Sequence, residues 1–219
     1  AGRHAQAFLG DWRGTLVCDD YSGYKALIAD GVTEAGCMAH ARRKFFELHA
    51  SHQSQLATVA LGYFQQLYAL EAPLVEVSAE ERQRQRQELA IPVLESFHDW
   101  LTTQRLCIPT GSGTARAMDY TLKRWQALTQ YVRDGQVPID NNWIENQIRP
   151  IALGRKNWLF AGSLRAGQRA AAIMSLIQSA RLNGHEPYAY LKDVLTRLPT
   201  HPNSKIAELL PHHWTPAYP

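Results

Sequence analysis

The middle of the chain has the apolar pattern of helices. Between residues 51 and 136, apolar side chains recur every three or four positions, which is the spacing of one helical face. Three amphipathic helices are predicted there. Their buried faces are expected to comprise Leu56, Val59, Tyr63, Leu67 and Leu70 in the first, Leu94, Phe97 and Leu101 in the second, and Ala117, Tyr120, Leu128 and Tyr131 in the third.

Polar and turn residues mark the ends of these helices. Ser78 and Glu81 have the spacing of a capping box, and Ser112 starts the third helix after a glycine-rich loop. Pro92 has no backbone N–H to donate, so we expect it to kink or divide the second helix. The alternating arginines of the sequence RQRQRQ, at residues 82–87, are interpreted as a solvated surface.

A short apolar run near the start of the chain predicts a strand. Leu16, Val17 and Cys18 stop abruptly at two acids, Asp19 and Asp20, which a Tyr-Ser-Gly turn follows. A carboxylate directly after a buried strand is held in place and faces solvent. Asp19 is therefore a candidate functional carboxylate.

Glu145 lies on a separate predicted helix. Pro138 and residues 140–141 make a helix start, and Ile144 belongs to the apolar side of this helix. Pro150 is expected to end it within about three turns, because proline cannot continue a helix. Mg²⁺ prefers oxygen ligands, so a strand-end Asp facing a helical Glu would form half of a metal cradle. Since the chain has 20 carboxylate side chains, the pair alone is weak support.

Composition sets wider bounds on the class of protein. With 219 residues, of which 45% are hydrophobic, the chain can bury a sizeable core as one large domain or two small ones. No apolar run is long enough to span a membrane and no secretory leader opens the chain, so a cytoplasmic location is expected. Three irregularly spaced cysteines fit a reducing compartment. A net charge of +3 permits nucleic-acid binding without demanding it, so DNA contacts would come from local clusters.

Four blocks of sequence, in order along the chain, resemble one known family. Residues 14–24 match the pattern G-x-L-x-x-D-G-Y-x-x-Y, except that Asp20 replaces the usual glycine. Residues 36–48 (GCMAHARRKFFEL) are similar to C-x-x-H-x-R-R-K-F, and the segment IDNNWIENQIRPIALGRKNWLFAGS follows at residues 139–163. Residues 169–199 are similar to the family's helical tail. Over most of its length, the chain resembles the insertion-sequence-sixty-six group of DDE transposases.

This resemblance implies a fold and a reaction. The fold class would be α/β, with a partial ribonuclease-H-like fold, a long all-helical insertion and a helical C-terminal tail. Asp19 and Glu145 would be catalytic ligands of Mg²⁺, or of Mn²⁺, in DNA cleavage and strand transfer. The expected division is residues 1–50 for the central part of the catalytic core, 51–136 for the helical insertion, 137–163 for the catalytic-Glu helix with the strand or loop after it, and 164–219 for the tail.

The family uses three carboxylates, and the first is expected to lie outside this chain. Asp11 is too close to Asp19 to belong to a strand two elements earlier, because each strand takes about five residues plus a connection. The chain, which begins without Met, is therefore expected to be a fragment that is inactive on its own. The alternatives are a non-catalytic remnant that binds DNA or a partner, and another ribonuclease-H-like nuclease.

DNA is the expected partner, together with further copies of the protein in an active homo-oligomer, and no membrane is expected. Plainer alternatives exist for several basic and aromatic residues. Residues 42–44 have the pattern of a solvated helix face. Arg149 has the spacing of a helical ion-pair partner for Glu145. Trp158 either stacks on an unpaired base or joins Leu159 and Phe160 in the core of a strand. The residues expected to contact DNA are Arg42, Arg43, Lys44, Arg149, Arg155 and Lys156, and the expected neighbours of the active site are Asp20, His40, Asn141 and Asn142.

A zinc site is the other metal alternative. Cys37-x-x-His40 and His49-x-x-His52 have superficially suitable spacing. On one continuous helix, however, His40 and His49 are about half a turn out of phase, so the two pairs would face opposite ways. We therefore disfavour zinc and expect Cys37 to be a buried strand residue.

Overall fold

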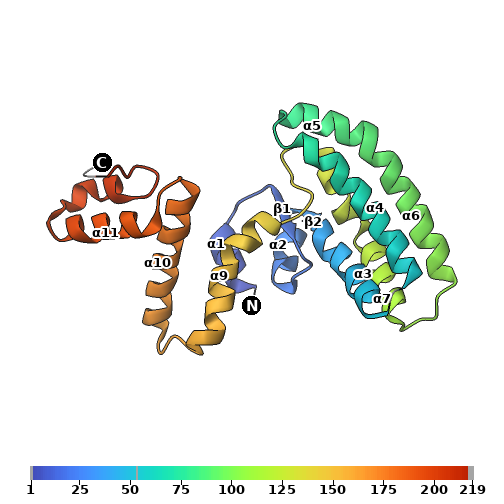
Figure 1. Ribbon diagram of the computed structural model, residues 1–219, viewed down its shortest axis with the longest axis horizontal. Coiled ribbons are helices and arrows are strands. Elements are labelled where there is room, and N and C mark those ends of the chain that lie inside the picture. Colours follow the sequence, from blue (N-terminus) through green and yellow to red (C-terminus); the bar gives the residue numbers. More distant parts are fainter. Residues whose placement is uncertain (1, 53, 217–219) are drawn as a thin grey trace. The chain divides into compact units, whose positions relative to one another are not determined.

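The chain divides into two compact units, residues 1–143 and 144–219. The computed structural model describes residues 2–52 and 54–216. The first unit opens with α1 (Arg3–Leu9). A β-α-β segment follows, made of β1 (Thr15–Cys18), a 3₁₀ turn (Ser22–Tyr24), α2 (Lys25–Ala29) and β2 (Thr33–Gly36) (Figure 1).

The two strands form a parallel pair. Thr15 lies opposite Thr33, and Cys18 lies opposite Gly36. The strand predicted at residues 16–18 is therefore confirmed. Because parallel strands run in the same direction, their carboxyl ends meet at one edge of the sheet. We call this the carboxyl edge, and it is where residues 18–19 and 36–37 lie.

A block of helices completes the first unit. Helices α4 and α6 run side by side, and α7 lies next to α3 (Figure 1). Ser78 and Ser112 cap α5 and α7 as predicted, since each hydroxyl accepts a hydrogen bond from the backbone N–H three residues later. The elements are α3 (Met38–His52), α4 (Gln55–Glu71), a 3₁₀ turn (Ala72–Leu74), α5 (Ala79–Gln85), a π-helical turn (Arg86–Ala90), α6 (Ile91–Leu106), α7 (Gly113–Lys123), α8 (Trp125–Leu128) and a 3₁₀ turn (Gln130–Arg133).

Aromatic rings from three helices form the centre of the first core. The ring centroids of Phe45 and Phe64 are 5.9 Å apart, and those of Phe64 and Phe97 are 5.1 Å apart. The buried face predicted for the second helix is confirmed in α6. Val59 differs from its prediction, because it is 45% exposed. The buried face of α4 instead includes Ala60, on the same side as Phe64.

Pro92 divides the second predicted helix, as expected. Helix α5 ends at Gln85, the π-helical turn covers Arg86–Ala90, and α6 starts at Ile91 with Pro92 in its first turn. Proline has no N–H for the carbonyl four residues earlier, and a wider π turn accommodates the missing hydrogen bond.

Arg86 contradicts the interpretation of residues 82–87 as a solvated surface. It is 2% exposed, and its guanidinium pairs with Glu71 through an Nε–Oε1 distance of 2.8 Å and an Nη2–Oε2 distance of 2.6 Å. Its third nitrogen, Nη1, donates to the backbone carbonyls of Tyr131, Asp134 and Val137. Arg86 thus joins the end of α4 to the segment that leads out of the helical block.

Helical phase explains why the three arginines differ. Arg82 and Arg86 are four residues apart and share one face, whereas Arg84 points to the opposite side. Arg82 donates to four backbone carbonyls, including that of Gly135 at 2.8 Å. Arg84 alone has the predicted solvated character, with a side chain that is 60% exposed.

The regular elements in the described part of the second unit are all helical. A small core holds α10 against the segments that follow it, and the predicted helical tail is confirmed. Its elements are most of α9 (Asn142–Trp158), then α10 (Leu164–Leu182), α11 (Pro187–Arg197) and 3₁₀ turns at Leu198–Thr200 and Asn203–Leu209. The core comprises Ala180, Tyr190, Val194, Leu209 and Trp214.

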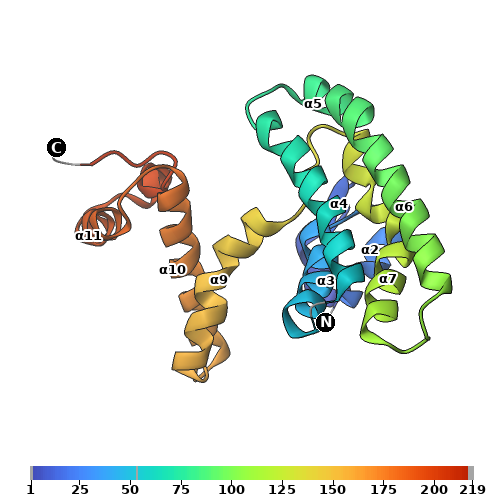
Figure 2. The ribbon, with the colours of Figure 1, turned by 45° about the vertical axis from the view of Figure 1, so that its right-hand side comes forward.

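Helix α9 is longer than predicted, because Pro150 lies inside it and does not end it. Proline commonly kinks a helix, and α9 changes direction along its length (Figure 2). None of the α9 side chains is buried, and Ile144 and Ile148 of its apolar side are 45% and 54% exposed. An exposed helix lets water satisfy the carbonyl that proline leaves without a partner, so the single lost hydrogen bond does not stop the helix.

The predicted α/β class is confirmed only in part. Two strands pair in parallel, but they are the only strands within residues 2–52 and 54–216, and the other regular elements there are helical. A ribonuclease-H-like sheet therefore stays a prediction. No helix in the described part of the chain has both the length and the apolar character needed to cross a membrane.

Gly135 is a position where a single methyl group should destabilise the first unit. A Cβ atom built there would lie 1.7 Å from the carbonyl oxygen of Ala79, which is backbone at the start of α5 and cannot rotate away. We expect Gly135→Ala to cost at least the roughly 1–3 kcal/mol typical of overpacking. Gly62→Ala is the matched control, because open space surrounds that helical site and alanine should stabilise α4 by about 0.5–1 kcal/mol. Urea unfolding of both variants measures whether the free energy of unfolding falls for Gly135→Ala and rises for Gly62→Ala. Equal stabilities of the two variants would contradict the close approach of Gly135 to the Ala79 carbonyl.

Candidate functional site

Asp19 is the first residue after β1, at the carboxyl edge of the sheet. Cys18 before it is 3% exposed and anchors the strand, whereas the side chain of Asp19 is 42% exposed. The backbone N–H of Cys37 donates to the carbonyl of Cys18 at 3.2 Å, which ties the ends of the two strands together. The strand therefore presents the Asp19 carboxylate to solvent from a fixed position.

His40 lies beside Asp19. It belongs to the first turn of α3, which starts directly after β2, and its Nε2 is 3.8 Å from Oδ2 of Asp19. This distance is too long for a hydrogen bond, but it allows a charge interaction when the imidazole is protonated. The expectation that His40 neighbours Asp19 agrees with this placement.

The thiols at the same edge are buried and have raised pKa values. Burial raises the pKa of Cys18, and burial also raises the pKa of Cys37, so both thiols stay protonated near neutral pH. The thiolate is the form that binds metals. Cys37 is 1% exposed and immediately follows β2, close to its predicted place in a strand.

Asp20 differs sharply from Asp19, although the two are adjacent. Its φ of 76° is a left-handed conformation that favours glycine, which accounts for glycine as the usual residue in the resembling pattern. Its Oδ1 accepts from Arg124 Nη1 at 2.6 Å and also from Lys25 Nζ. Burial alone would raise the pKa of the Asp20 carboxyl, but the Lys25 hydrogen bond and the Arg124 charge outweigh burial and lower that pKa. Asp20 is thus a carboxylate that is ion-paired with two cations.

The segment that leads into α9 is fastened at the carboxyl edge. The backbone N–H of Met38 donates to the carbonyl of Ile139 at 3.1 Å, and the N–H of Asn141 reaches Sγ of Cys37 at 3.5 Å. Asp140 accepts from the Tyr68 hydroxyl at 2.6 Å and from the N–H of Asn142 at 3.0 Å. Residues 139–142 therefore lie beside the start of α3.

The Asp140 contacts explain both the helix start and the ionisation of Tyr68. Asp140 also accepts from Nδ2 of Asn142 at 2.9 Å, so its carboxylate supplies the helix-starting contacts that the sequence predicted. Burial and the Asp140 carboxylate together raise the pKa of Tyr68. The Tyr68 hydroxyl is therefore a hydrogen-bond donor that stays protonated.

Glu145 and the basic residues after it lie along α9. Glu145 is in the first turn and is partly exposed, and Arg155 and Lys156 are exposed in the last turn. Arg149 is exposed as well, and its guanidinium makes no ion pair with any residue that the structure describes. The alternative of a helical ion pair between Arg149 and Glu145 is therefore wrong for this structure.

The three basic residues of α3 do not share one face. The guanidinium of Arg42 lies 5.7 Å from the ring centroid of Phe46, and the ammonium of Lys44 lies 4.3 Å from the ring centroid of Tyr120 in α7. Arg43 is exposed between them. The alternative of one solvated face is therefore wrong, and Lys44 is the member that packs toward the helix beside Asp19.

Residues 158–160 form the end of α9 and the turn after it, so the alternative of a core strand there is wrong. Trp158, Leu159 and Phe160 are 54%, 77% and 80% exposed. Leu159 has a φ of 62°, and a residue with a left-handed backbone does not continue a strand. A chain reversal into α10 thus replaces the expected strand.

The side chains at the carboxyl edge supply only some of the ligands that a hard cation such as Mg²⁺ needs. Asp19 offers an accessible carboxylate of the kind that Mg²⁺ prefers. Within the described residues, no group of three or more His, Cys, Asp or Glu side chains is arranged to hold a metal. For the zinc alternative, His49 Nδ1 instead contacts the Thr58 hydroxyl at 3.1 Å, and the side chain of His52 lies outside the described residues.

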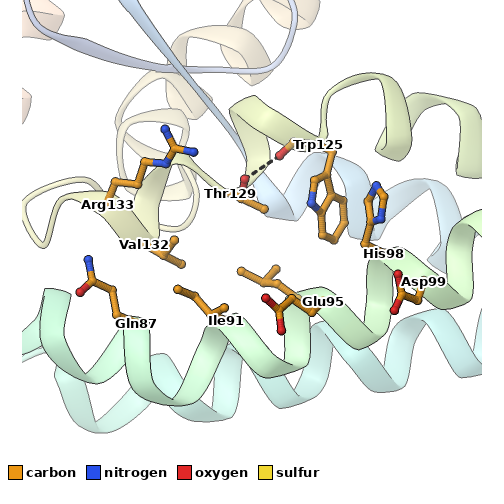
Figure 3. A pocket seen from close by; sticks show the side chains of 10 residues that line it. Gln87, Ile91, Glu95, His98, Asp99, Trp125, Thr129, Val132 and Arg133 are labelled. Atoms are coloured by element: carbon orange, nitrogen blue, oxygen red, sulfur yellow. Dashed lines mark hydrogen bonds between the residues drawn. The ribbon is translucent and has the colours of Figure 1, made fainter.

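A separate groove of about 560 Å³ lies on the helical block. Figure 3 shows His98 and Trp125 at one end, where their ring centroids are 4.9 Å apart, and Gln87 and Arg133 at the other. None of its lining residues is a predicted site residue. The groove is therefore distinct from the carboxyl edge.

Sequence reasoning missed Arg124, which is 6% exposed at the end of α7. One signal was present, because Arg124 follows Tyr120 by four residues and Ala117 by seven, which places it on the buried face predicted for the third helix. A buried cation requires a carboxylate partner. Glu34 and Asp20 were not recognised as those partners because they are about 90 or more positions away in sequence.

Comparisons with known proteins agree on one family. Residues 1–169 match the family described as Transposase IS66 family, and residues 175–212 match the IS66 C-terminal element. The uncharacterized proteins y4hP and y4qI of Sinorhizobium fredii (strain NBRC 101917 / NGR234) are 38% and 36% identical to the chain over 97% and 95% of its length. The chain spans about two fifths of these relatives, 42% and 40%. No solved structure matches.

Proposed function

Since the chain belongs to the IS66 family of transposases, we propose that it takes part in cutting and joining DNA by metal-dependent phosphoryl transfer. In this proposal Asp19 and Glu145 are metal ligands and DNA is the substrate. A third carboxylate and an active homo-oligomer belong to the same hypothesis.

The contacts at the carboxyl edge carry this proposal. Asp19 projects there beside His40, and hydrogen bonds hold residues 139–142 against the start of α3. Helix α9 begins at Asn142, and Glu145 follows three residues later in the sequence. The second candidate carboxylate thus enters its helix directly after a segment that is fastened beside the first.

Each residue has a chemical role in the proposed reaction. Asp19 and Glu145 would hold Mg²⁺ or Mn²⁺ through carboxylate oxygens. When bound, such ions polarise the phosphate, activate a water or a 3′-hydroxyl and stabilise the leaving oxygen. Arg155 and Lys156, exposed in the last turn of α9, would bind DNA phosphates. In-line displacement needs no covalent bond between protein and DNA.

Metal removal tests the proposed chemistry. The substrate is a plasmid that carries the DNA flanking the chain's own coding sequence, and the protein is used in its longest natural form. We expect EDTA to abolish nicking, and an excess of Mg²⁺ or Mn²⁺ to restore it, because the carboxylates act only through the ion. Gel separation of nicked from supercoiled plasmid gives the readout. Nicking that continues in EDTA, and that tracks with the purified protein, would contradict the proposal.

A further inference from the structure

The backbone directly after Asp19 is in an uncommon conformation. Asp20 has a φ of 76°, which side chains other than glycine rarely adopt. Such a conformation persists only when the surrounding contacts hold it. Because Asp19 and Asp20 share a peptide bond, a contact that fixes Asp20 also restrains the backbone of Asp19.

Arg124 is the residue that holds Asp20. Its Nη1 donates to Oδ1 of Asp20 at 2.6 Å, and its Nη2 donates to Oε1 of Glu34 in β2 at 2.9 Å. The side chain of Arg124 is 5% exposed, so little water competes for these bonds. A planar guanidinium that bridges two carboxylates fixes their relative positions. Lys25 adds a second cation to the same Asp20 oxygen.

The same end of α7 also contacts Asp19. The hydroxyl of Tyr120 lies 3.5 Å from the backbone carbonyl oxygen of Asp19. Tyr120 is one helical turn before Arg124, and the Arg124 guanidinium lies 5.9 Å from its ring centroid. Two side chains of one helix end therefore hold two consecutive residues of the loop that carries the proposed metal ligand.

We propose that Arg124 is a positioning residue for the Asp19 carboxylate, acting through Asp20 and Glu34. The helical block then has a role in the reaction, since it supplies the clamp that aims Asp19 at the carboxyl edge. This inference rests on the proposed function, because it requires Asp19 to act in the chemistry.

The first test replaces Arg124 by methionine, which keeps the length of the side chain and removes both ionic contacts. Arg105→Met is the matched control, because Arg105 also makes two hydrogen bonds to a carboxylate of α7, Asp119, at 2.6 and 3.1 Å, but does not contact the Asp19 loop. Initial rates of Mg²⁺-dependent nicking of the flanking-DNA plasmid are measured for the longest natural form of the protein. We expect Arg124→Met to lower kcat by about 10- to 100-fold with KM unchanged, the size of effect seen when a group behind a metal ligand is removed. Arg105→Met should leave both parameters at the wild-type values.

A second variant tests the same contact from its other side, so that the result does not depend on whether Arg124→Met folds correctly. Asp20→Asn removes the charge of the clamped carboxylate, while asparagine keeps its size and tolerates the left-handed backbone. We expect Asp20→Asn to lower kcat, and the double variant to be no slower than Arg124→Met alone, because Arg124→Met already breaks the contact with Asp20. Independent, additive losses would overturn the inference.

The outcomes separate this inference from the proposed function. If Asp19→Asn is inactive while Arg124→Met keeps the kcat of Arg105→Met, the positioning role is wrong and the proposed function stands. If Asp19→Asn remains active, the proposed function fails and the positioning role fails with it.

Discussion

Asp19→Asn and Glu145→Gln are each expected to abolish strand transfer while DNA binding remains nearly intact. Both changes keep the size of the side chain and remove the negative charge that a metal ion requires. Metal-assisted stabilisation of the transition state amounts to several kcal/mol. A loss of that size corresponds to a rate roughly a thousandfold lower or more. DNA binding should persist because the proposed function assigns it to basic side chains such as Arg155 and Lys156.

The measurement pairs a strand-transfer assay with DNA binding at fixed salt, since phosphate contacts depend steeply on ionic strength. Asp11→Asn is the control, because Asp11 is an exposed acid in the same part of the chain that forms no ion pair with a described residue. It should have wild-type activity. Strand transfer by either Asp19→Asn or Glu145→Gln would remove that residue from the proposed site.

Arg86→Met is expected to destabilise the first unit by about 3–5 kcal/mol, the cost of breaking a buried ion pair by removing one partner. The Glu71 carboxylate is 14% exposed and would lose both of its hydrogen bonds to the guanidinium. The carbonyls of Tyr131, Asp134 and Val137 would lose a donor at the same time. Methionine fills most of the space, so the loss reflects missing partners and not an empty cavity.

Arg84→Met provides the matched control for that prediction. Arg84 is two residues away and pairs with Glu81 and Glu88, but its side chain is 60% exposed and water replaces the lost contacts. Urea unfolding should show a large decrease in midpoint for Arg86→Met and little change for Arg84→Met. Equal stability of the two variants would contradict the buried role of Arg86.

The sequence predicted local features of the fold well. Helix faces, the caps at Ser78 and Ser112, the division at Pro92 and the strand at residues 16–18 all depend on neighbours within one or two turns. The error at Arg82 and Arg86 was one of interpretation, because helical phase already separated these residues from Arg84. Pro150 was misjudged because an exposed helix tolerates one missing hydrogen bond.

Contacts between distant segments were harder to predict. The placement of His40 beside Asp19 follows from the pairing of two short strands, and hydrophobic spacing gives no register for strands of four residues each. The bridge from Arg124 to Asp20 and Glu34 likewise joins residues that only the fold brings together. The sequence could indicate Asp19 as a candidate, but not the clamp beside it.

The most direct test of the central claim is a crystal structure of the protein soaked in Mn²⁺, with anomalous scattering used to locate the ion. The proposed function predicts an ion about 2.1 Å from a carboxylate oxygen of Asp19, with the carboxylate of Glu145 binding the same ion or a second one about 4 Å away. A structure in which Mn²⁺ binds elsewhere, while the Asp19 and Glu145 carboxyl groups lie about 15 Å or more apart, would contradict a shared metal site.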